Sequence, residues 1–186
     1  MPNEKGIWSQ EEADSGHLFS NYLAEIFAGT LASHIRVYDV GCGNGAYVKY
    51  LEDAGFESVI GIEGSQLENF KTHNIIIQDL TMPFELQTKG NVICLEVAEH
   101  IPAQYEDVFL KNVTGLVRVS GFLFLSWAVK GQDGIGHVNC KSNEYVVEKL
   151  HNLGFVYMRT HSQDMRNQVE EELSYFKNTL MVFLKK

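Results

Sequence analysis

Three closely spaced glycines form the part of the sequence best suited to hold a small ligand. Gly41, Gly43 and Gly45 follow the apolar run Val37–Val40 and precede a helical pattern that opens near Ala46. Glycine lacks a Cβ atom, so it adopts positive φ angles and lets the backbone approach a ligand closely. The first turn of the following helix presents unpaired N–H groups at the same place. This segment therefore predicts a cradle for a ligand that carries a ribose or a carboxylate.

Three acids stand at the ends of apolar runs. Asp39 precedes the first glycine, Glu63 closes the second run, and Asp79 closes the third. A carboxylate accepts hydrogen bonds from two vicinal hydroxyls at once, and it also accepts from an exocyclic amine. The glycines and Glu63 also fit a dinucleotide fingerprint. A nicotinamide enzyme, however, needs room for a substrate domain, which this length does not leave.

A second group of reactive side chains follows the fourth and fifth apolar runs. Glu96, Glu99 and His100 end one run, and His137 follows the next. A neutral imidazole near pH 7 accepts a proton, so His100 and His137 are candidate catalytic bases. The same four side chains also make a mixed oxygen and nitrogen shell for a divalent metal. A third interpretation is structural, in which this segment merely turns the chain into the next helix.

The candidate residues stand at the ends of separate apolar runs, and a parallel sheet would bring those ends together. Short, continuously apolar runs alternate with helical patterns, which favours strands buried on both faces and covered by helices. The regular alternation of strands and helices weakens near the C-terminus, where the pattern indicates two short strands at the end of the chain. We expect strands at 35–40, 58–62, 74–78, 92–97, 122–128, 155–160 and 179–184, and helices at 15–34, 47–54, 66–72, 103–117, 143–153 and 164–176.

The order of these motifs closely resembles that of the class I S-adenosylmethionine-dependent methyltransferases. It runs from Asp39-Val40-Gly41-Cys42-Gly43-Asn44-Gly45 through Gly61-Ile62-Glu63 and Gln78-Asp79-Leu80 to Ile93-Cys94-Leu95-Glu96-Val97-Ala98-Glu99-His100-Ile101-Pro102. The resemblance covers most of the chain from Ile35 onward.

The resemblance implies a fold and a cofactor. The fold is a Rossmann-like α/β fold with an open, mostly parallel seven-stranded sheet, helices on both faces, and an antiparallel last strand inserted beside the fifth. The implied cofactor is S-adenosylmethionine, with the glycine loop at its methionine end, Glu63 on both ribose hydroxyls and Asp79 with Leu80 at the adenine. The predicted cofactor site is Asp39, Gly41, Cys42, Gly43, Gly45, Glu63, Gly64, Asp79, Leu80 and Glu96.

Length, charge and cysteine content limit the number of domains, the partners and the location that we expect. The 186 residues predict a single domain, 1–186, with an N-terminal cap helix in segment 1–34. A net charge of -9 disfavours nucleic acid as a partner and favours small molecules. The chain shows no export signal or membrane-spanning run, and its three cysteines lack metal or disulfide spacing, so we expect a reducing, cytoplasmic location.

We therefore expect methyl transfer to a hydroxyl of a small molecule, with an amine as the second choice. One alternative follows from Glu96, Glu99, His100 and His137, whose spacing resembles the metal-dependent branch that methylates small-RNA 2′-hydroxyls or quinone-type rings. Another is an inactive module that binds the cofactor or a partner. Two tryptophans have two interpretations each: Trp8 is a lid over the site or a loose tail, and Trp127 is a wall of the acceptor pocket or core.

Overall fold

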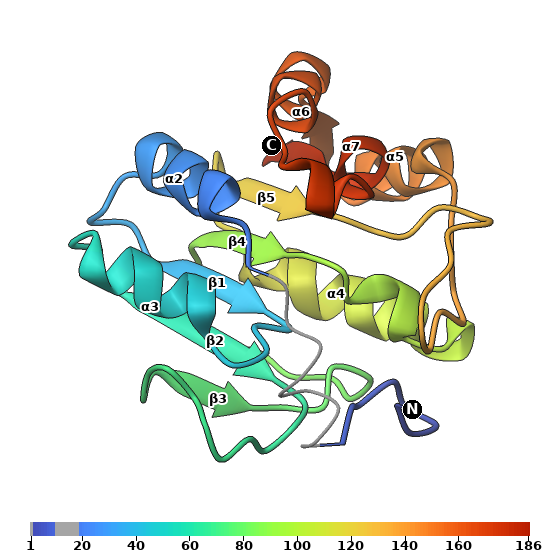
Figure 1. Ribbon diagram of the computed structural model, residues 1–186, viewed down its shortest axis with the longest axis horizontal. Coiled ribbons are helices and arrows are strands. Elements are labelled where there is room, and N and C mark those ends of the chain that lie inside the picture. The colour runs from blue at the N-terminus through green and yellow to red at the C-terminus, as the bar shows by residue number, and fades with distance from the viewer. Residues whose placement is uncertain (1, 10–18) are drawn as a thin grey trace.

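A computed structural model describes residues 2–9 and 19–186. Its centre is a seven-stranded sheet in the order β3-β2-β1-β4-β5-β7-β6 (Figure 1). The first five strands pair in parallel, and β7 pairs antiparallel with both β5 and β6. The strands are β1 (Val37–Val40), β2 (Val59–Glu63), β3 (Ile75–Ile77), β4 (Asn91–Cys94), β5 (Phe122–Leu125), β6 (Phe155–Tyr157) and β7 (Met181–Lys185).

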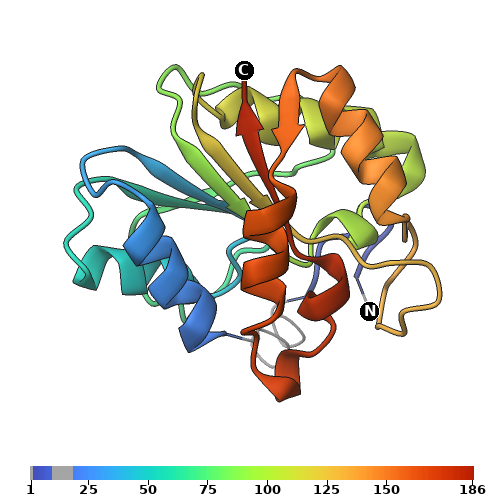
Figure 2. The same cartoon turned by 90° about the horizontal axis from the view of Figure 1, so that it is seen from above.

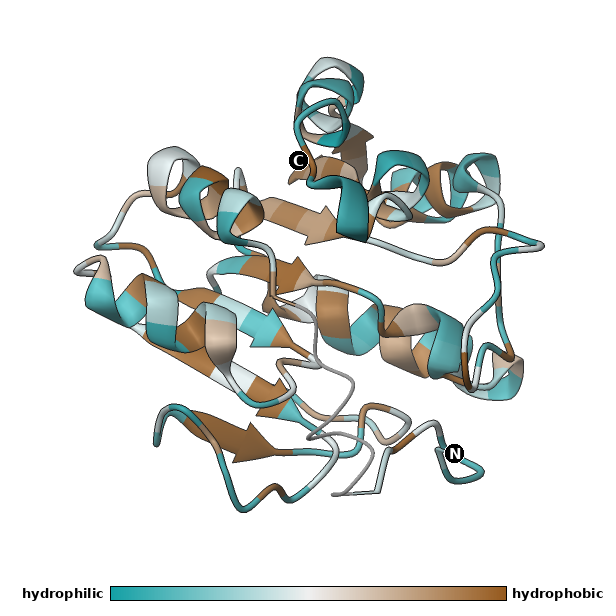
Figure 3. Ribbon diagram, in the orientation of Figure 1, coloured by the Kyte–Doolittle hydropathy of each residue, from teal (hydrophilic) through white to brown (hydrophobic). Residues whose placement is uncertain are grey.

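Helices cover both faces of this sheet (Figure 2). One apolar cluster joins the sheet to α4 and α5, and a second joins it to α2, α3, α6 and α7. Figure 3 shows the apolar strands between helices whose outer surfaces are hydrophilic. This arrangement confirms the predicted Rossmann-like α/β fold. The helices are α2 (Asn21–Thr30), α3 (Ala46–Asp53), α4 (Glu106–Leu116), α5 (Asn143–Asn152), α6 (Arg159–Arg166) and α7 (Phe176–Thr179), with 3-10 turns at Ala98–His100, Ala103–Tyr105 and Glu171–Leu173.

The predicted cap helix is present as α2. Its N-terminus is capped by Ser20, whose side chain accepts a hydrogen bond from the Leu23 N–H. Positions 15–18 of the predicted range lie outside the described residues. None of the helices in the described part of the chain combines the length and apolar character needed to cross a membrane.

The predicted helix at 66–72 is wrong, because the structure has an irregular connection there. A helix of this length is marginal unless a packed face stabilises it, and only Leu67 within the range is buried. The backbone bonds elsewhere instead, since the Lys71 N–H donates to the Asn44 carbonyl in the glycine loop.

The predicted elements near the C-terminus need a second correction. The sixth strand stops at Tyr157, and the predicted helix at 164–176 is replaced by α6, a 3-10 turn and α7. Glu170 accounts for the interruption: its carboxylate accepts from the Ser20 hydroxyl and the Tyr22 N–H, which ties this segment to the start of α2. Its backbone is extended, with φ -55° and ψ 147°, so a helix cannot run through it.

Candidate active site

A cavity of about 660 Å³ opens at the carboxyl ends of the central strands. The chain order reverses between β1 and β4, and open α/β sheets bind their ligands at such a point. The volume lies in the range of small-molecule sites. The cavity brings together nine of the residues predicted from sequence: Asp39, Gly41, Cys42, Glu63, Gly64, Leu80, Glu96, His100 and His137.

The glycine loop has the backbone that the sequence predicts. Gly41, Gly43 and Gly45 have φ angles of 72°, 54° and 81°, which side chains rarely tolerate. A Cβ at Gly41 would lie 2.3 Å from Cγ2 of Val97, so the close approach there excludes a side chain. Gly45 caps α3 in a left-handed conformation, and the helix begins at Ala46 as predicted.

Substituting Gly41 by alanine should destabilise the fold by about 1–3 kcal/mol, because it adds both backbone strain and a clash with Val97. Chemical denaturation measures this change. Gly29 is the matched control: it lies on the exposed side of α2, and nothing lies within 4 Å of the position that an alanine methyl would occupy. Gly29→Ala should instead stabilise the fold by about 0.5–1 kcal/mol. Equal effects of the two substitutions would contradict the assigned role of Gly41.

Glu63 ties this loop to the second strand. One carboxylate oxygen accepts from the Gly43 N–H at 2.8 Å, and the other accepts from the Ser65 N–H at 3.0 Å. Each carboxylate oxygen has two lone pairs, so Glu63 retains acceptor capacity on the cavity side. The predicted binding of two ribose hydroxyls is compatible with these contacts.

Asp39 is the clearest sign that the cavity is built to receive a polar ligand. Its side chain is buried, and its Oδ2 has no hydrogen-bond partner. Burial, together with the nearby charge of Glu63, raises the pKa of the Asp39 carboxyl to about 7. An unpartnered buried carboxyl oxygen is costly, so a ligand with a donor or a positive charge relieves a defect of the free protein.

The raised pKa of Asp39 predicts how stability depends on pH. Folded protein holds a proton that unfolded protein releases, so the contribution is full below the unfolded pKa and is lost as pH rises to about 7. Between pH 5 and pH 8 the wild type should lose about 2–3 kcal/mol of unfolding free energy that Asp39→Asn does not lose. Urea denaturation at both pH values measures the difference, with exposed Asp53→Asn as the control. A parallel loss in Asp39→Asn would contradict the prediction.

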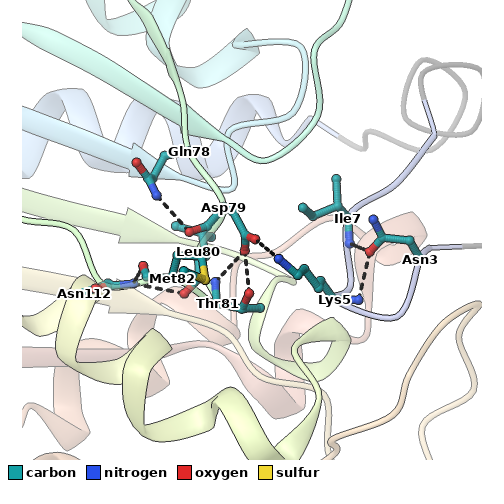
Figure 4. A network of polar contacts seen from close by, with 9 residues as sticks. All are labelled: Asn3, Lys5, Ile7, Gln78, Asp79, Leu80, Thr81, Met82 and Asn112. Atoms are coloured by element: carbon teal, nitrogen blue, oxygen red, sulfur yellow. Dashed lines mark hydrogen bonds and ion pairs between the residues drawn. The ribbon is translucent and has the colours of Figure 1, made fainter.

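Asp79 is placed differently from the other predicted cofactor residues. Its Oδ1 accepts from both the N–H and the hydroxyl of Thr81, and its Oδ2 pairs with the Lys5 ammonium at 2.8 Å (Figure 4). Burial raises the pKa of the Asp79 carboxyl, but the hydrogen bonds from Lys5 and Thr81 outweigh it and hold the pKa below its usual value. Leu80 lines the cavity, whereas Asp79 does not.

The two predicted catalytic histidines lie side by side. The ring centroids of His100 and His137 are 5.1 Å apart. Nδ1 of His100 lies 3.1 Å from the Gly136 carbonyl, and Nδ1 of His137 lies 3.3 Å from the Gln132 carbonyl. A carbonyl oxygen only accepts, so each Nδ1 carries a hydrogen. Nε2 of His137 lies 4.0 Å from Oε1 of Glu99. Burial lowers the pKa of His100 to about 4, which keeps its ring neutral.

Two acids lie next to these rings, Glu99, which is buried, and Glu96, which is half-buried. Glu99 is fully buried, and neither of its carboxylate oxygens has a hydrogen-bond partner. Burial raises the pKa of both Glu99 and Glu96. Glu96 lines the cavity with a strained backbone, φ 54°, and its carboxylate accepts long bonds from Gln132 at 3.4 Å and Thr179 at 3.5 Å. The atoms of Glu99, His100 and His137 that could bind a metal all lie within 4.8 Å of one another. Glu96 is outside this cluster.

Hydrogen bonds of the two residues after His137 hold its loop in place. The N–H groups of Val138 and Asn139 both donate to the Glu99 carbonyl at 2.9 Å. The Asn139 amide donates to the buried Glu106 carboxylate at 3.1 Å, and its carbonyl accepts from the Trp127 indole at 2.7 Å. Trp127 is therefore a core residue that positions the loop, and it does not line the cavity. His17, at the start of the predicted cap helix, is outside the described residues.

Several cavity residues carry no sequence signal of their own. The N-terminal residues Lys5, Gly6 and Ile7 join Trp8 along the opening, although Trp8 alone draws attention as a candidate lid. Asn44 and Lys71 meet beside the glycine loop, and Tyr175 and Phe176 come from the segment that the sequence assigns to a helix. Hydrophobic spacing marks Tyr175 and Phe176 as core, and no local pattern marks Lys5, Asn44 or Lys71, so only the tertiary fold places these residues at the cavity.

The comparison with protein families identifies the central part of the chain. Residues 38–125, which span β1 to β5, match a family described as a methyltransferase domain. No curated protein sequence matches the chain.

Solved structures share the fold over nearly the whole chain. Magnesium protoporphyrin IX methyltransferase from Synechocystis PCC 6803, with bound SAH, is 20% identical with a TM-score of 0.63, covering 95% of this chain and 83% of that one. The Burkholderia thailandensis 1,6-didemethyltoxoflavin-N1-methyltransferase, with its acceptor and S-adenosylhomocysteine bound, is 12% identical with a TM-score of 0.67, covering 95% and 84%. A TehB-like SAM-dependent methyltransferase from Corynebacterium glutamicum is 15% identical with a TM-score of 0.65, covering 95% and 92%.

Proposed function

We propose, from the methyltransferase domain family that residues 38–125 match, that this chain is a class I S-adenosylmethionine-dependent methyltransferase that methylates a hydroxyl group on a small molecule. The observation that carries the proposal is the pair of imidazoles that line the cavity, His100 after β4 and His137 after β5. The His100 ring is neutral and donates its Nδ1–H to a backbone carbonyl, so its Nε2 keeps a lone pair. The acceptor hydroxyl needs such a group, because it is a poor nucleophile until its proton is removed.

The residues of the cradle hold the cofactor. When bound, S-adenosylmethionine supplies an electrophilic methyl group on a sulfonium. Gly41 lines the cavity, the unpartnered oxygen of Asp39 gains a partner, and Glu63 accepts from hydroxyls. The apolar walls at Val97 and Phe176 exclude water, which favours an in-line displacement between aligned groups.

The charge of the acceptor end favours a neutral or cationic small molecule. Glu96 and Asp133 line this end, and Glu99 is buried beneath it. Lys5 and Lys71 are the lysines among the described lining residues, and they contact Asp79 and the glycine loop respectively. A phosphate-rich acceptor such as RNA would meet like charges here, in addition to the net charge of -9.

Two of the similar structures support a small acceptor by analogy. One protein acts on magnesium protoporphyrin IX, and the other was crystallised with 1,6-didemethyltoxoflavin. They differ from each other in acceptor, so the hydroxyl in our proposal depends on the two imidazoles rather than on these relatives.

A turnover screen tests this proposal. Release of S-adenosylhomocysteine is measured with a panel of hydroxylated small molecules, each paired with its amine analogue and its O-methyl ether. We expect turnover with a hydroxyl compound and none with its ether. Turnover confined to the amines would overturn the hydroxyl assignment. Tight cofactor binding without turnover across the panel would favour the inactive binding module.

A second candidate is metal-dependent O-methylation, and one observation favours it. Histidines that bind metals usually donate their other ring N–H to a carbonyl or carboxylate, and both His100 and His137 donate Nδ1–H to backbone carbonyls. Glu99 adds a buried carboxylate without a hydrogen-bond partner. These residues suit a divalent ion with mixed oxygen and nitrogen ligands, which would lower the pKa of the acceptor hydroxyl.

The metal candidate predicts that Mn²⁺ binds the free protein at a single site. Calorimetric titration with Mn²⁺ should give saturable binding in the wild type and at least about tenfold weaker binding in His137→Ala, because one ligand is lost. A strong chelator should remove activity, and added metal should restore it. Activity that survives the chelator, or binding that survives the substitution, would end this candidate and leave the imidazoles as bases.

A further inference from the structure

The N-terminal residues 2–8 lie across the opening of the cavity and contact both of its ends. Lys5 reaches Asp79, which follows β3, whereas Pro2 packs against Gly136 in the loop after β5, where a Cβ on Gly136 would lie 2.4 Å from Cγ of Pro2. Between these points Lys5, Gly6, Ile7 and Trp8 line the cavity. We call residues 2–8 the strap.

The strap has its own internal structure. The Asn3 side-chain oxygen accepts from the N–H groups of Lys5 at 2.9 Å and Ile7 at 3.1 Å (Figure 4). The Asn3 N–H donates to the Ile7 carbonyl, and the Gly6 N–H donates to the Asn3 carbonyl. An asparagine that bonds its own downstream backbone stabilises a tight turn. The strap is therefore a preformed turn that carries Lys5 and Ile7.

The strap docks on residues of both halves of the site. The Ser65 hydroxyl donates to the Trp8 carbonyl at 2.8 Å, two residues after Glu63. The Trp8 ring meets the edge of His100 at a centroid distance of 5.2 Å. Gly6 has φ 81°, and a Cβ there would lie 2.3 Å from the His100 carbonyl oxygen, so this contact requires glycine.

The ion pair between Lys5 and Asp79 is the outer attachment of the strap. Both oxygens of Asp79 are occupied, one by Thr81 and one by Lys5. The resemblance assigns Asp79 to the adenine end of the cofactor, but in this chain a lysine covers that carboxylate and itself lines the cavity. A lysine ammonium has three donors, and Asp79 uses one of them.

We propose that the strap completes the cofactor site at its adenine end and retains the cofactor, with the Lys5–Asp79 ion pair as its latch. The latch opens when cofactor or product passes the mouth of the cavity and closes behind it. This inference rests on the cofactor pocket and not on the identity of the acceptor. Its tests use binding of S-adenosylhomocysteine, so they remain decisive even if the proposed hydroxyl acceptor is wrong.

The first experiment measures dissociation of S-adenosylhomocysteine by stopped flow. Lys5→Met removes the charge and keeps the length of the side chain, so dissociation should become about fivefold faster, as expected for a partly exposed ion pair. Lys5→Arg keeps the pair and should stay near the wild-type rate. Lys49→Met is the matched control, since Lys49 pairs with Asp53 on exposed α3, away from the cavity.

Ionic strength provides a second readout of the same rates. Salt screens the latch, so the wild-type dissociation rate should rise between about 0.05 and 0.5 M salt, a range over which the Debye length falls about threefold. The dissociation rate of Lys5→Met should change little over the same range. A dissociation rate in Lys5→Met equal to that in Lys49→Met would overturn the latch. Slower dissociation in Lys5→Met would show that the strap obstructs the site, and would also overturn it.

Fluorescence of Trp8 reports the strap directly. Subtracting the signal of Trp8→Phe isolates Trp8 from the buried Trp127. We expect bound S-adenosylhomocysteine to reduce acrylamide quenching of Trp8 at least about twofold, because a closed strap shields the ring. Melting temperatures confirm that each variant is folded. Quenching that is unchanged by the ligand would show that the strap does not respond to the site and would refute its role in retention.

Discussion

Replacing Glu63 with alanine is expected to weaken binding of S-adenosylmethionine about a hundredfold or more, with little loss of folded protein. Hydrogen bonds to a charged group contribute about 1.5–3 kcal/mol each, and two ribose hydroxyls would lose their acceptor together. The substitution also releases the Gly43 N–H, which Glu63 holds at 2.8 Å, so the glycine loop loses one of its supports. Isothermal titration calorimetry measures the affinity.

The control for this prediction is another glutamate that ties two segments together outside the cavity. Glu52 on α3 accepts from the Thr72 hydroxyl and the Asn74 amide. Glu52→Ala should therefore lower the melting temperature without changing the affinity for the cofactor. Wild-type affinity in Glu63→Ala would refute its assignment to the ribose, whatever the effect on stability.

Replacing His100 with alanine is expected to lower kcat by about 100- to 10,000-fold, the usual effect of losing a positioned proton acceptor. Affinity for S-adenosylhomocysteine should change by less than about threefold, because the residues that hold the cofactor remain. The neutral ring supplies the effect, since its Nδ1–H is used by the Gly136 carbonyl and its Nε2 is left to accept. Steady-state kinetics with the acceptor found in the turnover screen measures the change.

His73 provides the matched substitution for this second prediction. It is exposed on the connection between β2 and β3, and His73→Ala should have wild-type kcat. Added imidazole should restore part of the activity of His100→Ala. A kcat in His100→Ala close to that of the wild type would exclude both the base and the metal-ligand roles of this residue.

Local patterns account for the parts of the fold and the site that could be predicted from sequence. The continuous apolar runs identified the strands. The central strands β1 and β4 are buried on both faces, so every residue in them is shielded from solvent and the sequence shows a nearly continuous apolar run rather than an alternation. The glycines identified the cradle, since Gly41 adopts a backbone that other residues avoid. Each of these features is encoded within about ten residues of the chain.

Features that depend on distant contacts could not be predicted in this way. The ion pair of Lys5 with Asp79 joins residues 74 positions apart, and no local pattern marks it. Glu170 begins a run of three acidic residues, yet its carboxylate binds the start of α2, and its extended backbone interrupts the helix predicted at 164–176. The segment 66–72 has helical spacing, but tertiary contacts of its backbone prevail over a weak propensity.

The position of β7 has a consequence for how the chain folds during synthesis. β7 is the last strand to be made, yet it lies between β5 and β6 and pairs with both. Until residues 181–185 leave the ribosome, the edge of β5 presents unpaired N–H and C=O groups, which invite association with other chains. Nascent chains of this protein should therefore expose an unpaired edge of β5 until β7 emerges and pairs with it.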